Sequence, residues 1–134
     1  MSIVLLDTCV LTDLADTKND WFEWCVSTLE DLDSENRFVI NPIIYSEFSV
    51  GFDRIEEVEK FISALGLGLE NIPKPALFLA GKAFLQYKRN RGSKSNVLPD
   101  FLIGAHAAVE NFILMTRDKG RYATYFPTVE LVIP

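Results

Sequence analysis

Residues 3–7, Ile-Val-Leu-Leu-Asp, decide the fold class, because they form a continuous apolar run that stops abruptly at an acid. Such a run is typical of a strand that is buried on both faces, as the strands of parallel sheets are. The signal recurs strongly at residues 38–40 and 112–115 and more weakly at residues 67–72 and 129–133. The sequence therefore predicts a small parallel β-sheet.

A helix is predicted most clearly between residues 55 and 65, where apolar side chains recur at helical spacing. Asp53 and Glu56, three residues apart, indicate a capping box at its start. Gly66 is typical of the residue that follows a helix, because glycine adopts the left-handed backbone conformation at little cost. These signals bound the helix at both ends.

Further helices separate the other strands. They are expected at residues 21–32, 75–87 and 99–111, with one more that begins at Asn41 as N-cap and Pro42 as the first helical residue. Strands that alternate with helices predict an α/β fold, with helices on both faces of the sheet in a three-layer α/β/α arrangement. Ligands of such folds collect at the carboxyl ends of the strands.

Length and composition limit the classes of protein to consider. The 134 residues fit a single domain, and 13 basic against 19 acidic residues give a net charge of −6. Overall charge therefore does not favour a nucleic-acid binder. Cys9 and Cys25 lack the spacing of a zinc site or a disulfide scaffold, and no apolar run is long enough for a membrane span. We expect a cytoplasmic protein without a membrane partner.

The basic residues are unevenly distributed. Residues 1–60 hold 4 basic and 14 acidic side chains, net −10, whereas residues 61–134 hold 9 basic and 5 acidic ones, net +4. Five basic residues with no acid between them lie at Lys82, Lys88, Arg89, Arg91 and Lys94. Arg89, Arg91 and Lys94 could bind RNA phosphates, or the segment could be a solvated helix end, where the helix dipole favours cations. The sequence leaves both interpretations open.

Four acids stand beside the most apolar segments. Asp7 and Asp118 each follow a predicted strand, whereas Glu47 and Asp100 lie in apolar predicted helices. Two carboxylates ~4 Å apart at an effective dielectric constant near 20 repel by about 4 kcal/mol, which a cation would offset. Oxygen ligands alone favour Mg²⁺ or Mn²⁺. We therefore expect the four acids to meet in one metal-binding pocket.

Each acid also has a structural explanation. Asp7 could cap a helix that begins near Thr8, and Asp100 could be a first-turn acid that interacts with the helix dipole. Glu47 could pair with an arginine, and Asp118 could form a turn. These explanations suffice singly but do not account for the joint placement of the four acids.

Four segments in this order resemble the PIN-domain ribonucleases and, among them, the VapC-type toxins of bacterial toxin-antitoxin pairs. They are Leu-Leu-Asp-Thr-Cys-Val-Leu at 5–11, Ile-Tyr-Ser-Glu-Phe at 44–48, Asp-Phe-Leu-Ile-Gly-Ala-His-Ala at 100–107, and Thr-Arg-Asp-Lys-Gly-Arg-Tyr at 116–122. Residues 122–127 are similar to the usual ending of these toxins. Cys9 departs from the family pattern, which commonly has Asn at this position.

The resemblance implies a single PIN-like domain over residues 1–134 and a function. Asp7, Glu47, Asp100 and Asp118 would bind Mg²⁺ or Mn²⁺, and Thr116 would be a supporting polar residue. The reaction would be endonucleolytic hydrolysis of RNA, with transfer RNA as the first candidate. A VapB-like antitoxin would be the protein partner, the toxin would form a homodimer, and promoter DNA would be bound only through the antitoxin.

Two rival chemistries are disfavoured and one alternative function remains. His106 is the only histidine, which excludes a ribonuclease that uses two imidazoles, and it is interpreted as a core or interface residue. Cys9 lies in an acidic segment that disfavours its thiolate, so a cysteine nucleophile is not expected. The alternative function is a non-catalytic PIN-like module that binds RNA or protein, against which the complete set of four acids argues.

Overall fold

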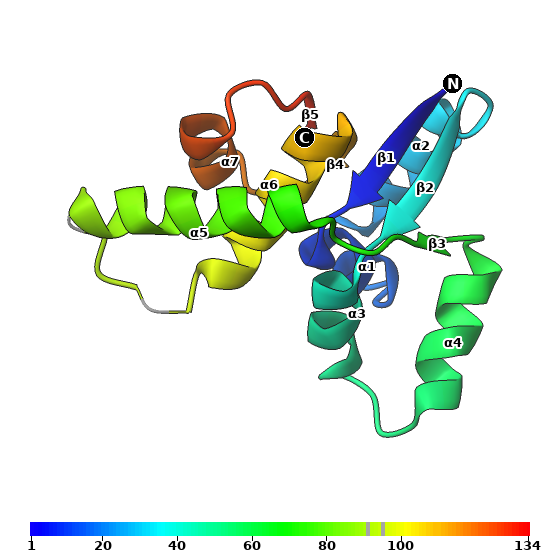
Figure 1. Cartoon of the computed structure of the whole chain (residues 1–134). Coiled ribbons are helices and arrows are strands. Elements are labelled where there is room, and N and C mark those ends of the chain that lie inside the picture. The colour runs from blue at the N-terminus through cyan, green and yellow to red at the C-terminus, as the bar shows by residue number, and fades with distance from the viewer. Residues whose placement is uncertain (91, 95) are drawn as a thin grey trace.

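A parallel sheet forms the centre of the molecule, as the computed structural model shows for residues 1–90, 92–94 and 96–134 (Figure 1). The strands are β1 (Ser2–Leu6), β2 (Asn36–Ile40), β3 (Gly68–Leu69), β4 (Ile113–Met115) and β5 (Leu131–Val132). In the described part of the chain their order is β3-β2-β1-β4-β5, and every pairing is parallel. The predicted parallel sheet is confirmed, including its two weakest strands.

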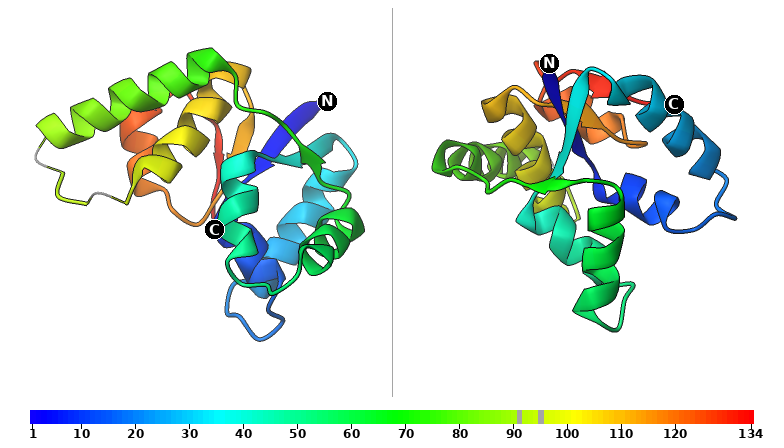
Figure 2. Two further views of the ribbon diagram at one scale, coloured as in Figure 1. Left: turned by 60° about the horizontal axis from the view of Figure 1, so that its bottom comes forward. Right: turned by 90° about the vertical axis from the view of Figure 1, so that its right-hand side faces the viewer.

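Helices connect these strands and lie on both sides of the sheet, as the two views of Figure 2 show. They are α1 (Thr8–Leu14), α2 (Phe22–Asp33), α3 (Pro42–Ser49), α4 (Ile55–Ala64), α5 (Lys74–Arg89), α6 (Leu98–Glu110) and α7 (Gly120–Tyr125). The long helix α5 packs along α6, and α1 contacts both α2 and α3. The three-layer α/β/α arrangement is confirmed. No helix within the described residues is both long and apolar enough to cross a membrane.

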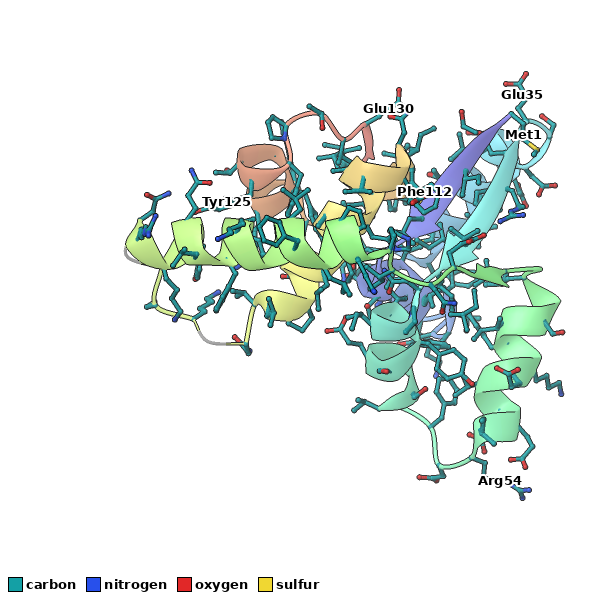
Figure 3. All side chains as sticks on the ribbon, in the orientation of Figure 1. Met1, Glu35, Arg54, Phe112, Tyr125 and Glu130 are labelled. Carbon is teal, nitrogen blue, oxygen red and sulfur yellow. The ribbon has the colours of Figure 1, made fainter. Side chains whose placement is uncertain are left out.

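Burial explains why the apolar run at residues 3–6 has no polar alternation. β1 is the central strand, between β2 and β4, and Val4, Leu5 and Leu6 are fully buried. Each buried side chain of this size contributes about 1.5–3 kcal/mol of hydrophobic stabilisation. Met1 and Glu35 mark the amino ends of β1 and β2 (Figure 3), so the carboxyl ends of both strands lie at the opposite edge of the sheet.

Two predicted helix boundaries are confirmed and one is wrong. The Asn41 side chain accepts a hydrogen bond from the Ile44 N–H and caps α3, and Gly66 has the expected positive φ of 65° after α4. The predicted capping box at Asp53 does not form, because Arg54 takes the N-cap position and makes no side-chain cap bond. The acids in the first turn of α4 instead interact favourably with the helix dipole.

One short helix lies where the sequence indicated only a turn. α7 follows Asp118 and Lys119 and is six residues long, which is too short to be stable in isolation. Its Tyr122 is buried in the core, and the helix packs on α6. Tertiary contacts therefore stabilise α7, and local sequence gives little sign of it.

Candidate active site

Asp7 lies at the carboxyl end of β1, where it is the N-cap of α1 and only 6% exposed. Its carboxylate accepts hydrogen bonds from the Thr8 N–H (2.8 Å), the Thr116 hydroxyl (2.7 Å) and the Tyr122 hydroxyl (3.1 Å). Burial raises the pKa of Asp7 above 3.8, and the nearby Glu47 charge raises it further. The three hydrogen bonds lower the pKa but do not cancel this rise. The capping explanation is therefore correct, but among the described residues only neutral groups donate hydrogen bonds to this buried carboxyl group.

Sheet register brings Thr116 and Asp118 to Asp7. β1 and β4 are paired so that Leu6 is opposite Met115, and the Asp7 N–H donates to the Met115 carbonyl. Thr116 is fully buried, and its hydroxyl donates to Asp7 while it accepts from the Asp118 N–H at 3.0 Å. Thr116 thus connects Asp7 to the exposed residue Asp118, and its supporting role at the site stays a prediction.

Asp100 reaches the same edge of the sheet from the first turn of α6. Burial raises its pKa above 3.8, the charges of Asp7 and Asp118 raise it further, and the Arg121 guanidinium lowers it. Asp100 accepts a hydrogen bond from Arg121 of α7 and forms an ion pair with it. Asp100 is therefore close enough to Asp7 and Asp118 to feel both charges.

Glu47 completes the set from α3. It accepts a hydrogen bond of 2.6 Å from the Thr8 hydroxyl, and its charge acts on Asp7. No ion pair of Glu47 with an arginine occurs among the described residues. We refer to Asp7, Glu47, Asp100 and Asp118 below as the four site acids.

The four site acids fit a divalent cation in chemistry and in charge. All their donors are oxygens, which Mg²⁺ and Mn²⁺ prefer, and within the described residues no cationic side chain pairs with Asp7 or Glu47. The expected closed pocket is not preformed, however. Across residues 1–90, 92–94 and 96–134, no three His, Cys, Asp or Glu side chains converge closely enough to hold a metal ion. Their assignment as metal ligands stays a prediction.

A second buried acid was missed in the sequence. Asp13 of α1 is 1% exposed and pairs with Arg117, whose Nε donates at 2.6 Å, while Asn19 Nδ2 donates at 3.0 Å. The Arg117 guanidinium lies over the Trp21 ring, 5.5 Å from its centroid. The sequence signal that could have revealed Asp13 is the position of an acid on a short apolar helix, shortly after Val10 and Leu11.

Three residues of the basic segment, Lys82, Lys88 and Arg89, lie on α5, and Lys94 lies in the segment after it. Arg89 and Lys94 are exposed, and the Lys88 ammonium donates to the Lys94 carbonyl at 3.4 Å. The predicted contact Arg91 lies outside the described residues. Lys88 and Arg89 occupy the last turn of α5, where the helix dipole also favours cations. The geometry leaves the RNA-binding interpretation a prediction.

His106 and Cys9 behave as structural residues. His106 is fully buried, its Nδ1 is 3.1 Å from Asn41 Nδ2, and its ring packs edge-on against Phe112. The core interpretation of His106 is thus confirmed. Burial, reinforced by the Asp7 charge, raises the pKa of the Cys9 thiol to about 11, which disfavours a thiolate nucleophile. Cys9 and Cys25 are both free thiols.

Comparisons with known proteins agree on one fold. The family model described as PIN domain matches residues 4–127. Similar solved structures include VapBC2 from Rickettsia felis bound to a DNA fragment from its promoter (TM-score 0.74, 20% identity, 98% of each chain covered). VapBC-1 from nontypeable Haemophilus influenzae has a TM-score of 0.74 at 19% identity, with 98% of this chain and 97% of that chain covered.

A third similar structure is a toxin-antitoxin complex from Klebsiella pneumoniae, with a TM-score of 0.69 and 25% identity over 96% of this chain and 95% of that one. A search of curated proteins gives no match. The sequence match and the structural matches thus cover nearly the same residues.

Proposed function

Because the chain belongs to the PIN domain family, we propose that it is a Mg²⁺- or Mn²⁺-dependent endoribonuclease. The observation that carries this proposal is the position of Asp7. It is a buried carboxylate at the carboxyl edge of the sheet, the charge of Glu47 acts on it, its own charge acts on Asp100, and within the described residues no cationic side chain pairs with it. Such a group is costly to bury unless a cation compensates it.

The four site acids would hold the cation, with Thr116 and Tyr122 orienting Asp7 through hydrogen bonds. When bound, a divalent cation supplies an activated water and stabilises the charge that develops on the phosphate and leaving oxygens. Sheet register, the α1 cap and two buried hydroxyls together fix the position of the Asp7 carboxylate. The exposed Asp118 is the acid most open to solvent and substrate.

The biological role that we propose is that of a VapC-type toxin in a type II toxin-antitoxin pair. Similar solved structures include VapBC and other toxin-antitoxin complexes, and the Rickettsia felis VapBC2 complex is bound to a DNA fragment from its promoter. By analogy, this chain would bind a VapB-like antitoxin, form a homodimer and reach promoter DNA only through the antitoxin. We place its action in the cytoplasm, where its RNA substrates are.

The substrate that we propose is RNA, with transfer RNA as the first candidate. Arg89, Arg91 and Lys94 would contact its phosphates, since they form the most basic segment in an otherwise acidic chain. Incubating the antitoxin-free protein with total RNA and sequencing the new 5′ ends would identify the cleaved species. If the new 5′ ends lie only in messenger or ribosomal RNA, that RNA is the substrate and transfer RNA is not.

Metal-dependent cleavage tests the proposal directly. Purified protein should cut RNA when Mg²⁺ or Mn²⁺ is added and should stop when EDTA is added. Asp7→Asn and Asp100→Asn should each abolish cleavage while the circular dichroism spectrum remains that of the wild type. Asp31→Asn, on an exposed position of α2, is the matched control and should cut normally. Wild-type cleavage by both site variants would refute the assignment.

One observation favours the alternative of a non-catalytic PIN-like module that binds RNA or protein. An active metal centre would require potential ligands to converge, and no three among the described residues do so in the arrangement shown. The two functions separate in one experiment. RNA that is bound but left intact at every concentration of Mg²⁺ and Mn²⁺ would favour the binding module.

A further inference from the structure

One ion pair in the described part of the chain involves a site acid, and it joins Arg121 to Asp100. Arg121 Nη1 donates to Asp100 Oδ2, which connects the second residue of α7 to the first turn of α6. The two side chains are 17% and 32% exposed, respectively. Ion pairs between fully exposed side chains are weak because water and salt screen them. This pair is sheltered from much of that screening.

Two aromatic rings hold the Arg121 guanidinium in addition to Asp100. Its central carbon lies 5.8 Å from the ring centroid of Tyr87 and 5.9 Å from that of Phe101. These two rings pack on each other with centroids 5.6 Å apart, and Tyr125 also packs on both, below α7 in Figure 3. A guanidinium within about 6 Å of a ring centroid is attracted by the aromatic ring as well as by the carboxylate. The cation is therefore fixed at the site by packing.

The charges around Asp100 explain why a cation is retained there. Asp7 and Asp118 both disfavour a negative charge on Asp100, whereas Arg121 favours it. Arg121 thus offsets a repulsion that a divalent cation would also offset. It does so by occupying an oxygen of a carboxylate that the cation would need as a ligand.

We propose that Arg121 is a built-in counter-ion of Asp100 that competes with the divalent cation for this carboxylate and so weakens metal binding. The inference rests on the proposed function, since it concerns the same site. Two groups that bind one carboxylate are coupled reciprocally: the free energy by which Arg121 weakens metal binding equals that by which the metal weakens the Arg121–Asp100 ion pair.

Metal titration of Arg121→Gln tests this competition. We expect its dissociation constant for Mn²⁺, measured by calorimetry, to be lower than that of the wild type by about 5- to 150-fold, the usual range of such couplings. Arg37→Gln is the matched control, since it removes the same charge from an exposed ion pair with Glu70 near the amino end of β2. Its Mn²⁺ affinity should equal that of the wild type.

Thermal unfolding provides a readout that does not depend on activity. In EDTA, Arg121→Gln should melt below the wild type, because Asp100 loses its counter-ion. At saturating Mn²⁺ this deficit should shrink, because the cation replaces the guanidinium. Arg121→Lys keeps the charge and should bind Mn²⁺ much as the wild type does. It keeps the test decisive if Arg121→Gln does not fold.

The outcomes separate the inference from the proposed function. Equal Mn²⁺ affinities of the wild type and Arg121→Gln would overturn the inference and leave the metal site intact. An Arg121→Lys variant that binds Mn²⁺ far more tightly than the wild type would also overturn it. If neither the wild type nor Arg121→Gln binds millimolar Mn²⁺, the metal-dependent function fails, and the inference fails with it.

Discussion

At the scale of single residues, the site depends on Asp7. The fold buries the Asp7 carboxylate away from water and also provides hydrogen-bond donors to it. Four neutral groups, the Cys9 thiol among them, donate to its carboxylate, yet burial still raises its pKa above 3.8. The charged form is therefore less favourable in the folded protein than in the unfolded chain. A group of this kind reduces stability at neutral pH and is retained for another reason, which we take to be metal binding.

This raised pKa predicts a pH dependence of stability. A carboxyl group whose pKa is raised by folding stabilises the fold fully below its unfolded pKa, and that contribution is lost as the pH rises through the folded pKa. As the pH rises above about 4, the free energy of unfolding in EDTA should therefore fall more steeply for the wild type than for Asp7→Asn. Urea denaturation at several pH values measures both slopes, and parallel profiles would contradict the prediction.

Thr116 should matter for both stability and activity. Thr116→Val removes the hydroxyl that donates to the buried Asp7 carboxylate and accepts from the Asp118 N–H, so Asp7 loses its shortest side-chain donor and the Asp118 N–H loses its acceptor. We expect a loss of about 1–3 kcal/mol in the free energy of unfolding, together with reduced RNA cleavage. Thr124→Val, an exposed position on α7, is the control and should change stability by no more than about 0.5 kcal/mol. Equal effects of the two substitutions would exclude the proposed role of Thr116.

At the scale of elements, the two short helices that follow β1 and β4 build the site. α1 begins directly after Asp7, and its Thr8 hydroxyl donates a hydrogen bond to Glu47. On α7, the Tyr122 hydroxyl donates to Asp7 and the Arg121 guanidinium donates to Asp100. Neither helix is long enough to be stable in isolation, so both depend on packing against longer elements. The contact of α6 with the end of α7 is therefore a point where packing affects the site.

Gly104 permits that contact. A Cβ atom at Gly104 would lie 2.4 Å from ring atoms of Phe126, which follows α7 and is buried. Gly104→Ala should therefore lower the free energy of unfolding by about 1–3 kcal/mol. Gly81→Ala on α5 is the matched control, since a Cβ there meets nothing within 4 Å, and it should raise helix stability by up to about 1 kcal/mol. Chemical denaturation of both variants checks the difference in sign, and a neutral Gly104→Ala would show that Phe126 moves freely.

At the scale of the whole molecule, an acidic amino-terminal half and a basic carboxyl-terminal half share one parallel sheet. β1 and β4 come from the two halves and pair directly, which brings Asp7 beside Thr116. Arg117 and Arg121 are engaged with Asp13 and Asp100, so they neutralise acids of the fold. Arg89 and Lys94 remain exposed at the end of α5 and in the segment after it, where a polyanion could reach them.

RNA binding should therefore lose salt dependence when these two charges are removed. In an Asp7→Asn background that does not cut, Arg89→Gln with Lys94→Gln should lower the slope of log affinity against log salt by about one unit per lost phosphate contact. Lys18→Gln with Lys60→Gln is the charge-matched control in the acidic half. Filter binding at several salt concentrations gives the slopes, and an unchanged slope in the first variant would identify the segment as solvated surface.

The sequence by itself determined the parallel sheet, the layer arrangement, most helices and the edge at which the acids lie. These features follow from local periodicity, from apolar runs and from caps such as Asn41 and Gly66, which need no knowledge of distant residues. Only the tertiary structure decided which side chains meet: Thr8 with Glu47, Asp13 with Arg117 and Asp100 with Arg121. Sheet register and helix orientation fix such pairs, and because the partners are separated by up to 104 residues, no local pattern encodes them.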